Sequence, residues 1–299
     1  AEKGIPYIFQ HHDHHAFHYG KDSDVYRKNK EAMEKSLCSL VPARYLVDYF
    51  ECDKVEYFSH GVDTDFFYPN ETYPCNHSLL MLANNGLGGY GSYDRKGFGL
   101  GIQLAMATDL PITIAGPSFN KAFFNQHLWM FNYPKLNLVF DTPNSKLLEL
   151  YHSHDIFIHP TMLEAGHPNL TLLEALASGL PIVGTFEENN SLDGMVTVKR
   201  NTNQIVDAIK NVINNYDFFK KDAIKQAQKL SWKNQTLKLL EYYKPNMKNQ
   251  LIDIYNNTKQ LNILPKIESP EFNINFIDGA FFEIKGGPDK KYEVKFIDK

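Results

Sequence analysis

The sequence has few of the features that mark secreted, membrane-spanning or nucleic-acid-binding proteins. Its three cysteines, Cys38, Cys52 and Cys75, form no CxxC pair and are odd in number. We therefore expect no disulfide framework, and we expect the protein to be in a reducing compartment. No apolar run approaches the roughly 18 residues that a bilayer span needs, and no secretory signal is visible. The formal net charge of -4 gives no electrostatic reason to expect nucleic acid or an anionic membrane as the main partner. We expect a cytoplasmic protein.

What remains is an ordinary globular composition. The chain has 299 residues, of which 43% are hydrophobic and 22% are charged. That length accommodates one large domain or two ordinary ones.

The stretch from Ile156 to Thr185 predicts a strand, a polar loop, a helix and a second strand. Residues 155–158 form an apolar run typical of a buried strand. Asn169 can cap a helix that Gly179 ends. The polar groups follow the first strand at its carboxyl end, where open α/β sheets bind ligands.

The start of this helix has the properties of an anion site. Its first backbone N–H groups have no partners inside the helix, and the helix dipole adds partial positive charge there. A phosphate or diphosphate fits such an end without a basic side chain. Glu174 lies about one turn into the helix, and Glu164 lies on the loop before it. Two carboxylates that flank an anion site suit a nucleotide sugar, which carries hydroxyls on both sides of its diphosphate.

Strand and helix patterns alternate along most of the chain, which predicts a parallel, doubly wound α/β sheet. We expect strands over 5–9, 37–41, 55–58, 79–83, 110–115, 136–140, 155–158 and 180–184. We expect helices over 24–36, 42–50, 96–108, 144–152, 169–178, 202–213, 217–229 and 232–243. Alternating apolar residues in the last part of the chain predict a small antiparallel β-meander.

These patterns divide the chain into four parts. Residues 1–70 are expected to be a partial N-terminal α/β domain with its linker, because some sixty residues are too few for a self-sufficient core. Residues 71–230 are expected to form the ligand-binding domain. Residues 231–265 are expected to form a crossover helix and connector, and residues 266–299 a β-hairpin or meander tail.

Four blocks of the sequence resemble retaining GT-B glycosyltransferases of the family 4 type, also called group 1. The segment 55–69 resembles the family's interdomain "NGVD…F.P" motif, and 79–105, with Lys96-Gly97, resembles its first donor-domain strand, loop and "KG" helix. Residues 112–116 resemble its "l.iaG" strand. Residues 137–185 resemble the block that ends in "LEAmA.G.PVV.t". Four blocks in family order are more specific than a single glycine motif.

The resemblance implies a GT-B-like fold, with a Rossmann-like donor domain, a truncated Rossmann-like N-terminal part and a small antiparallel β segment at the C-terminus. It implies transfer of a hexose from a nucleoside diphosphate sugar to a carbohydrate, lipid or protein hydroxyl, with retention and without a cofactor or metal. It also implies a site whose catalytic residues are Glu164 and a histidine. We choose His14 for this histidine from the His11–His15 cluster. The implied donor-binding residues are Arg95, Lys96, Gly166, His167, Pro168, Asn169, Leu170, Thr171 and Glu174.

The sequence departs from the family pattern in three respects. Glu164 and Glu174 enclose nine residues, where the family usually has seven, and Asn84 replaces a usual arginine. Most of the N-terminal domain is missing, so a preceding segment or a second chain is expected to complete it. A degenerate, non-catalytic sugar-nucleotide-binding module and a GT-B-fold epimerase or phosphorylase therefore stay open as alternatives. A peripheral membrane contact and a homo-oligomer also stay open.

Overall fold

The chain forms two compact units, residues 1–239 and residues 240–299. The structure is a computed structural model. It describes residues 7–12, 15–70, 76–83, 94–118, 121, 124, 132–162, 164, 166–186, 192–243, 272–274, 280–285 and 293–298. Within this part of the chain, no helix is both long enough and apolar enough to cross a membrane.

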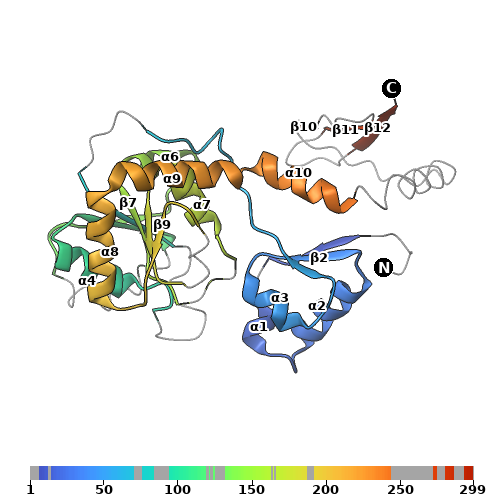
Figure 1. The fold of residues 1–299 in the computed structure, drawn as a ribbon, viewed down its shortest axis with the longest axis horizontal. Helices are drawn as coiled ribbons and strands as arrows, with labels where there is room; N and C mark the ends of the chain where they lie inside the picture. Colours follow the sequence, from blue (N-terminus) through green and yellow to red (C-terminus); the bar gives the residue numbers. More distant parts are fainter. Residues whose placement is uncertain are drawn as a thin grey trace. The chain divides into compact units, whose positions relative to one another are not determined.

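A six-stranded parallel sheet is the centre of the first unit (Figure 1). Its strands are β4 (Leu79–Leu82), β5 (Ile112–Gly116), β6 (Leu136–Phe140), β7 (Ile156–His159), β8 (Ile182–Gly184) and β9 (Met195–Thr197). The order across the sheet is β6-β5-β4-β7-β8-β9, and every neighbouring pair is parallel. The order reverses between β4 and β7, and in such sheets ligands bind at the carboxyl ends of the strands beside this switch point.

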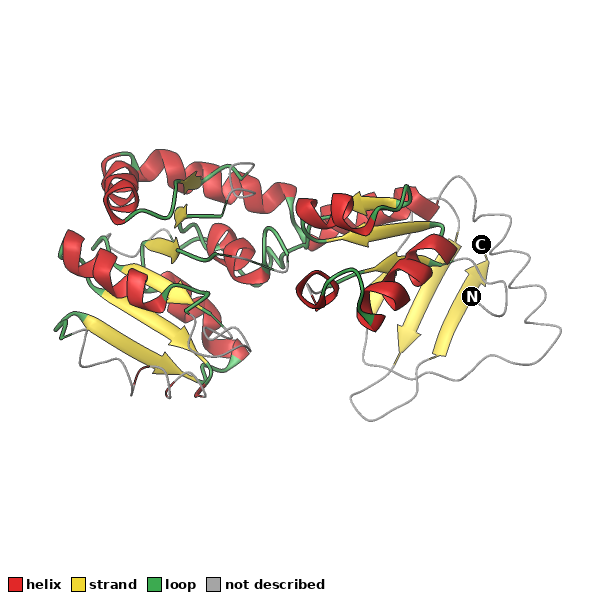
Figure 2. Ribbon diagram, turned by 90° about the horizontal axis from the view of Figure 1, so that it is seen from below, coloured by secondary structure: helices red, strands yellow, loops and turns green. Residues whose placement is uncertain are grey.

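Helices pack on both faces of this sheet because successive residues of a strand point to opposite faces (Figure 2). In β4, Leu79 and Met81 join one core and Leu80 joins the other. Helices α4 (Phe98–Thr108) and α8 (Thr202–Asn214) contribute to the first core. Helices α6 (Asn144–His152), α7 (Leu170–Ala177) and α9 (Tyr216–Lys229) contribute to the second. Burial on both faces explains why the strands are almost continuously apolar.

A smaller parallel sheet occupies the first part of the chain. Its strands are β1 (Ile8–Gln10), β2 (Cys38–Val41) and β3 (Val55–Tyr57), in that order. Helices α1 (His15–Tyr19), α2 (Asp24–Lys35) and α3 (Arg44–Phe50) connect them and enclose a core of their own. The Ser23 hydroxyl caps α2 by accepting a hydrogen bond from the Tyr26 amide.

The segment after β3 pairs with the end of α9. Val62 N donates to the Leu230 carbonyl at 3.0 Å, and Trp232 N donates to the Val62 carbonyl at 2.9 Å. A Cβ on Gly61 would lie 2.8 Å from the Trp232 ring, so only glycine allows this close approach. The last helix of this region is α10 (Trp232–Tyr243).

The second unit contains an antiparallel sheet of strands β10 (Phe272–Ile274), β11 (Ala280–Lys285) and β12 (Glu293–Asp298). The register pairs Phe282 with Phe296 and Ile284 with Val294. The predicted meander is therefore present, while the turns expected between its strands lie outside the described residues.

The structure confirms the predicted α/β class and the parallel sheet, with some local differences. Residues 5 and 6 of the expected strand over 5–9 lie outside the described residues, and β1 runs over Ile8–Gln10. The helix expected from residue 42 begins at Arg44. The sequence patterns did not predict α1 or β9. Both elements are short, with five and three residues, and such lengths give little periodicity to detect.

Candidate active site

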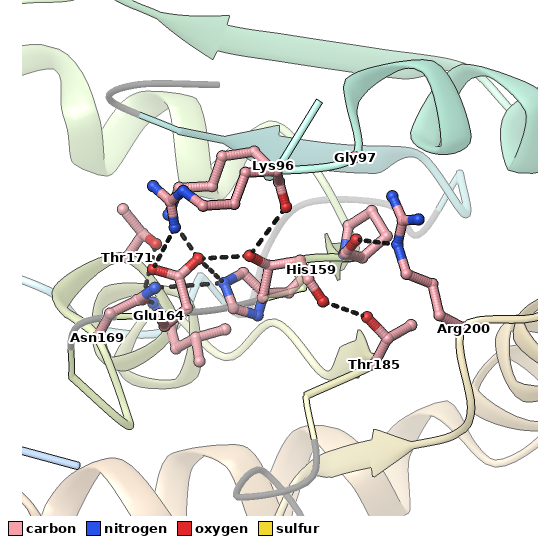
Figure 3. A network of polar contacts seen from close by, with 12 residues as sticks. Lys96, Gly97, His159, Glu164, Asn169, Thr171, Thr185 and Arg200 are labelled. Atoms are coloured by element: carbon pink, nitrogen blue, oxygen red, sulfur yellow. Dashed lines mark hydrogen bonds and ion pairs between the residues drawn. The ribbon is translucent and has the colours of Figure 1, made fainter. Parts of the chain in front are cut away.

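Glu164 is the centre of a polar network at the carboxyl end of β7 (Figure 3). Its side chain is buried, and its Oε1 lies 2.5 Å from Lys96 Nζ. The Thr161 hydroxyl lies 2.8 Å from the same oxygen, and His159 Nε2 lies 3.3 Å from it. Arg95 Nη1 is 3.8 Å from Oε2. A buried carboxylate is thus compensated by two cations and by two further polar groups.

This environment keeps Glu164 ionised. Burial favours the neutral acid, but the charges of Lys96 and Arg95 and the contact with His159 outweigh burial and hold the pKa of Glu164 well below its usual range. Burial lowers the pKa of His159, so its ring is neutral near pH 7. Oε1 is shared by three groups, which leaves Oε2 as the oxygen with more capacity to accept a hydrogen bond from a ligand.

The backbone brings Lys96 to this position through a glycine. Gly97 has a φ of 79°, and a Cβ there would lie 2.5 Å from the Pro160 carbonyl oxygen, so no other residue fits without movement. The Met162 amide donates to the Arg95 carbonyl at 3.1 Å. The start of α4 is therefore attached directly to the chain that leaves β7.

The chain that leaves β7 is also held from the other side. Thr185, which follows β8, donates its hydroxyl hydrogen to the Thr161 carbonyl at 2.7 Å. Arg200 Nε donates to the Pro160 carbonyl at 3.2 Å, and Figure 3 shows both contacts. The backbone of Pro160 and Thr161, from which the loop with Glu164 begins, is thus fixed by hydrogen bonds.

The N-terminus of α4 is closed by a side chain. The carboxylate of Asp94 accepts hydrogen bonds from the amides of Gly97, Phe98 and Gly99 at 2.8–2.9 Å. These are the amides that an incoming anion would need. The start of α4 therefore contributes Lys96 to the site, but its own amides already have an acceptor.

The N-terminus of α7, in contrast, is open. Asn169 Oδ1 caps the helix by accepting from the Leu172 amide at 3.0 Å, and the Thr171 hydroxyl donates to the same oxygen. In the described part of the chain, no acceptor is bonded to the amides of Leu170 and Thr171. The Leu170 side chain is half exposed. Two free amides and the helix dipole can hold an anionic oxygen here.

Residues of the smaller sheet and its connections hold the loop between β7 and α7. The Tyr45 hydroxyl donates to the Glu164 carbonyl at 3.0 Å, and the Tyr57 hydroxyl donates to the His167 carbonyl at 2.6 Å. The His167 amide donates to the Pro42 carbonyl at 2.7 Å. The peptide bond from His167 to Pro168 is cis. A loop that would otherwise depend on its own residues is therefore braced by the first part of the chain.

Glu174 lies apart from this network, one turn into α7. Its Oε2 accepts a hydrogen bond from the hydroxyl of Tyr151, a fully buried residue of α6, at 2.8 Å. Burial raises the pKa of Glu174 to about 7, although the hydrogen bond from Tyr151 opposes the change. Glu174 is thus a carboxyl group that is only partly ionised at neutral pH.

The histidine-rich segment divides between core and site. His11 is buried against Phe50, with ring centroids 5.2 Å apart. The exposed His12 stacks on His60, and a Cβ on Gly166 would lie 2.9 Å from His60 Nε2. His14, the predicted catalytic histidine, lies outside the described residues. No group of three His, Cys, Asp or Glu side chains within the described ranges is arranged to hold a metal ion.

The structure thus gathers most of the predicted site residues at one edge of the sheet. Arg95, Lys96 and Glu164 are in contact, and Asn169, Leu170 and Thr171 form the adjacent helix end. His159, Thr161 and Tyr151 were not among the predicted site residues. The signal for His159 and Thr161 was available, because both residues follow the apolar core of β7 at its carboxyl end.

A comparison with protein families matches the part of the chain that contains the candidate site. Residues 135–215 match the family model of glycosyl transferases group 1, and this range contains Glu164, all of α7 and Glu174. No curated protein matches the chain.

Solved structures show the fold. Sucrose-phosphate synthase from Thermosynechococcus elongatus superposes with a TM-score of 0.65 at 15% identity, over 85% of this chain and 70% of that one. Anabaena HepE, in complex with UDP and glucose, superposes with a TM-score of 0.63 at 10% identity, over 80% of this chain and 72% of that one. TarM gives 0.63 at 13% identity, over 81% of this chain and 51% of that one. The chain therefore has the GT-B glycosyltransferase fold and spans between about half and about 70% of these proteins.

Proposed function

We propose that the protein is a retaining glycosyltransferase that transfers a hexose from a nucleoside diphosphate sugar to a hydroxyl acceptor. The observation that carries this proposal is the open end of α7 beside the buried Glu164–Lys96 pair, within the range that matches the glycosyltransferase family. The complex of HepE with UDP and glucose supports a nucleotide sugar as the donor.

In this proposal the diphosphate binds at the start of α7. The amides of Leu170 and Thr171 donate to its oxygens, and Lys96 and Arg95 neutralise its charge. The backbone of 166–168 borders the site, because it leads directly into the Asn169 cap. Glu174 accepts hydrogen bonds from the ribose hydroxyls, and Glu164 Oε2 accepts one from the sugar.

The chemistry needs stabilisation of the leaving diphosphate. The bond between the anomeric carbon and the diphosphate oxygen breaks, and the acceptor oxygen bonds to the same face of that carbon. The acceptor proton passes to an oxygen of the leaving phosphate. A helix N-terminus and a lysine stabilise the charge that develops there, so we propose that no metal is needed for this step.

A histidine of the first part of the chain is proposed to face the transferred sugar. His14 stays a candidate, and His12 becomes a second one because it stacks on His60, which touches Gly166 in the donor loop. Burial and the neighbouring His12 lower the pKa of His60 to about 4, so this ring is neutral at pH 7.

One observation favours a non-catalytic alternative. Lys96 already contacts Glu164 at 2.5 Å, so a diphosphate must compete with a buried carboxylate for this cation. If Glu164 keeps this cation, the leaving diphosphate lacks its charge stabilisation, and the site can bind a sugar nucleotide without transferring the sugar. Turnover of a bound donor separates the two functions, since a binding module releases its donor unchanged.

The donor assignment is tested by Glu174→Ala. Calorimetry with UDP-glucose and GDP-mannose should show that whichever nucleotide sugar the native protein binds loses affinity by about tenfold or more, because a partly buried hydrogen-bonding partner is removed. The matched control is Glu149→Ala, which removes an exposed glutamate of α6 that pairs with Lys146. Unchanged affinity in folded Glu174→Ala would refute the ribose contact.

A further inference from the structure

Thr161 is a rigidly held hydrogen-bond donor beside Glu164. It lies two residues after the end of β7 and is only 1% exposed. Its hydroxyl oxygen is 2.8 Å from Glu164 Oε1. The Thr185 hydroxyl donates to the Thr161 carbonyl at 2.7 Å, and a side chain that is branched at Cβ has few χ1 rotamers. The position of the Thr161 hydroxyl is therefore fixed through both its backbone and its side chain.

The Thr161 hydroxyl has one proton and two oxygens near it that can accept this proton. One is Oε1 of Glu164, an ionised carboxylate, which can only accept. The other is the Arg95 carbonyl, at 3.3 Å. The carboxylate is closer and carries charge, and hydrogen bonds to charged acceptors are the stronger ones. The hydroxyl therefore donates to Glu164.

The other close donor to Glu164 Oε1 is Lys96, whose Nζ lies 2.5 Å away (Figure 3). Its ammonium is carried on a flexible four-carbon stem. In the proposed function the diphosphate draws on this same cation. The His159 ring is farther from Oε1, at 3.3 Å. Once Lys96 turns to the diphosphate, Thr161 is therefore the close donor that Oε1 keeps among the residues that the structure describes.

We propose that Thr161 is a positioning residue that keeps Glu164 Oε1 in place while Lys96 turns to the diphosphate, so that Oε2 stays directed at the transferred sugar. The terminal torsion of a glutamate side chain is broad, so the carboxylate rotates easily unless one oxygen is held. The proposal rests on the proposed function for its ligand, whereas the contact between Thr161 and Glu164 belongs to the protein alone.

Two substitutions separate the hydroxyl from the shape of the side chain. Thr161→Val keeps the branched shape and removes the donor, and Thr161→Ser keeps the donor. The matched control is Thr108→Val on α4, which removes a hydroxyl that donates to the Leu104 carbonyl at 2.8 Å. Calorimetry with UDP-glucose and GDP-mannose measures affinity, and urea unfolding measures the folding equilibrium constant.

A double-mutant cycle shows whether Thr161 acts through Glu164. The cycle compares Thr161→Val in the native protein with the same substitution in Glu164→Ala. A residue that acts through Glu164 loses its effect when that carboxylate is absent, whereas a merely structural residue keeps it.

We expect Thr161→Val to weaken binding of whichever nucleotide sugar the native protein binds, and to lower the folding constant, each by about tenfold, because a hydrogen bond to a charged group is lost. Thr161→Ser should stay within about threefold of the native values, and Thr108→Val should leave affinity within about twofold. In Glu164→Ala, Thr161→Val should change the folding constant by no more than about twofold.

The outcomes distinguish a failure of this proposal from a failure of the proposed function. If the native protein binds neither nucleotide sugar, the donor assignment fails, while the unfolding measurements still test Thr161. Native affinity and stability in Thr161→Val, a Ser variant as impaired as the Val variant, or equal losses in both arms of the cycle would overturn the role of Thr161. If Glu164→Ala does not fold, the comparison of the Val and Ser variants decides.

Discussion

Two carboxylates of the site differ in their ionisation because their neighbours differ. Glu164 has two cations within 4 Å and stays ionised, with its pKa well below the usual range because these charges outweigh burial. Glu174 has a tyrosine hydroxyl as its partner and no cation bonded to it within the described residues, and burial raises its pKa to about 7. Two glutamate side chains thus differ in their degree of ionisation at neutral pH because their surroundings differ.

The raised pKa of Glu174 makes the stability of the protein depend on pH. The native state binds a proton more tightly than the unfolded chain, so this group destabilises the fold as pH rises from about 4.5 to about 7. Glu174→Gln keeps the acceptor for Tyr151 but cannot ionise. We expect it to be as stable as the native protein below pH 4.5 and up to about 3 kcal/mol more stable above pH 7.

Chemical denaturation at pH 4 and pH 8 measures this difference. A Gln variant whose unfolding free energy follows that of the native protein at both pH values would show that Glu174 is not desolvated as described.

At the residue scale, the sequence allowed prediction of which residue types gather at the site but not of their partners. Glu164, Lys96 and Asn169 were predicted from helix-end physics and the family resemblance. The hydrogen bond from Tyr151 to Glu174 joins residues 23 positions apart on two helices, and no local pattern encodes such a contact. The same holds for the tyrosine hydroxyls that brace the loop, which come from more than 100 residues earlier in the chain.

At the scale of elements, two helix ends face the site and differ in how their amides are satisfied. Asp94 fills the end of α4, whereas α7 keeps the amides of Leu170 and Thr171 for a ligand. The sequence predicted the start of α7 correctly because Asn169 is a favoured cap followed by an apolar run. The Asp94 cap was not predicted, because the helix was expected over 96–108 and Asp94 lies before that range.

Two helices that are capped by an asparagine side chain offer a matched comparison. Asn169 caps α7 and Asn201 caps α8, with amide-to-oxygen distances of 3.0 and 3.2 Å. Replacing either with alanine should cost about 1 kcal/mol of stability. Only Asn169→Ala should also weaken nucleotide-sugar binding, since only α7 presents its end to the ligand. Thermal unfolding and calorimetry on both variants measure the two effects, and equal affinity in the two would contradict an anion site at α7.

At the scale of the whole molecule, the first part of the chain serves the donor loop as well as its own core. Its three-stranded sheet encloses a small core, yet Tyr45, Tyr57 and Pro42 hydrogen-bond to residues 164–167. The alternation of strands and helices was sufficient to predict the parallel sheet. Strand order and the bracing of the loop required the structure, because they depend on contacts between residues far apart in the sequence.

The bracing leads to a prediction at this scale. Tyr57→Phe removes the hydrogen bond to the His167 carbonyl but keeps the ring on which Arg44 stacks at 4.3 Å. We expect nucleotide-sugar affinity to fall by roughly fivefold, in line with about 1 kcal/mol for one hydrogen bond. The control is Tyr49→Phe, which loses a 2.9 Å bond to the Ala16 carbonyl within the same part of the chain. Equal effects of the two substitutions on affinity would argue against a loop braced by Tyr57.

The central claim is that the end of α7 and the Glu164–Lys96 pair form the donor site of a glycosyltransferase. Ligand-observed NMR with a panel of nucleotide sugars tests it most directly, because one experiment reads both binding and slow hydrolysis of the donor. We predict saturation transfer to at least one nucleotide sugar, release of free sugar over hours, and a clear decrease of both signals in Glu174→Ala. A folded native protein that binds none of the panel at millimolar concentration would contradict the claim.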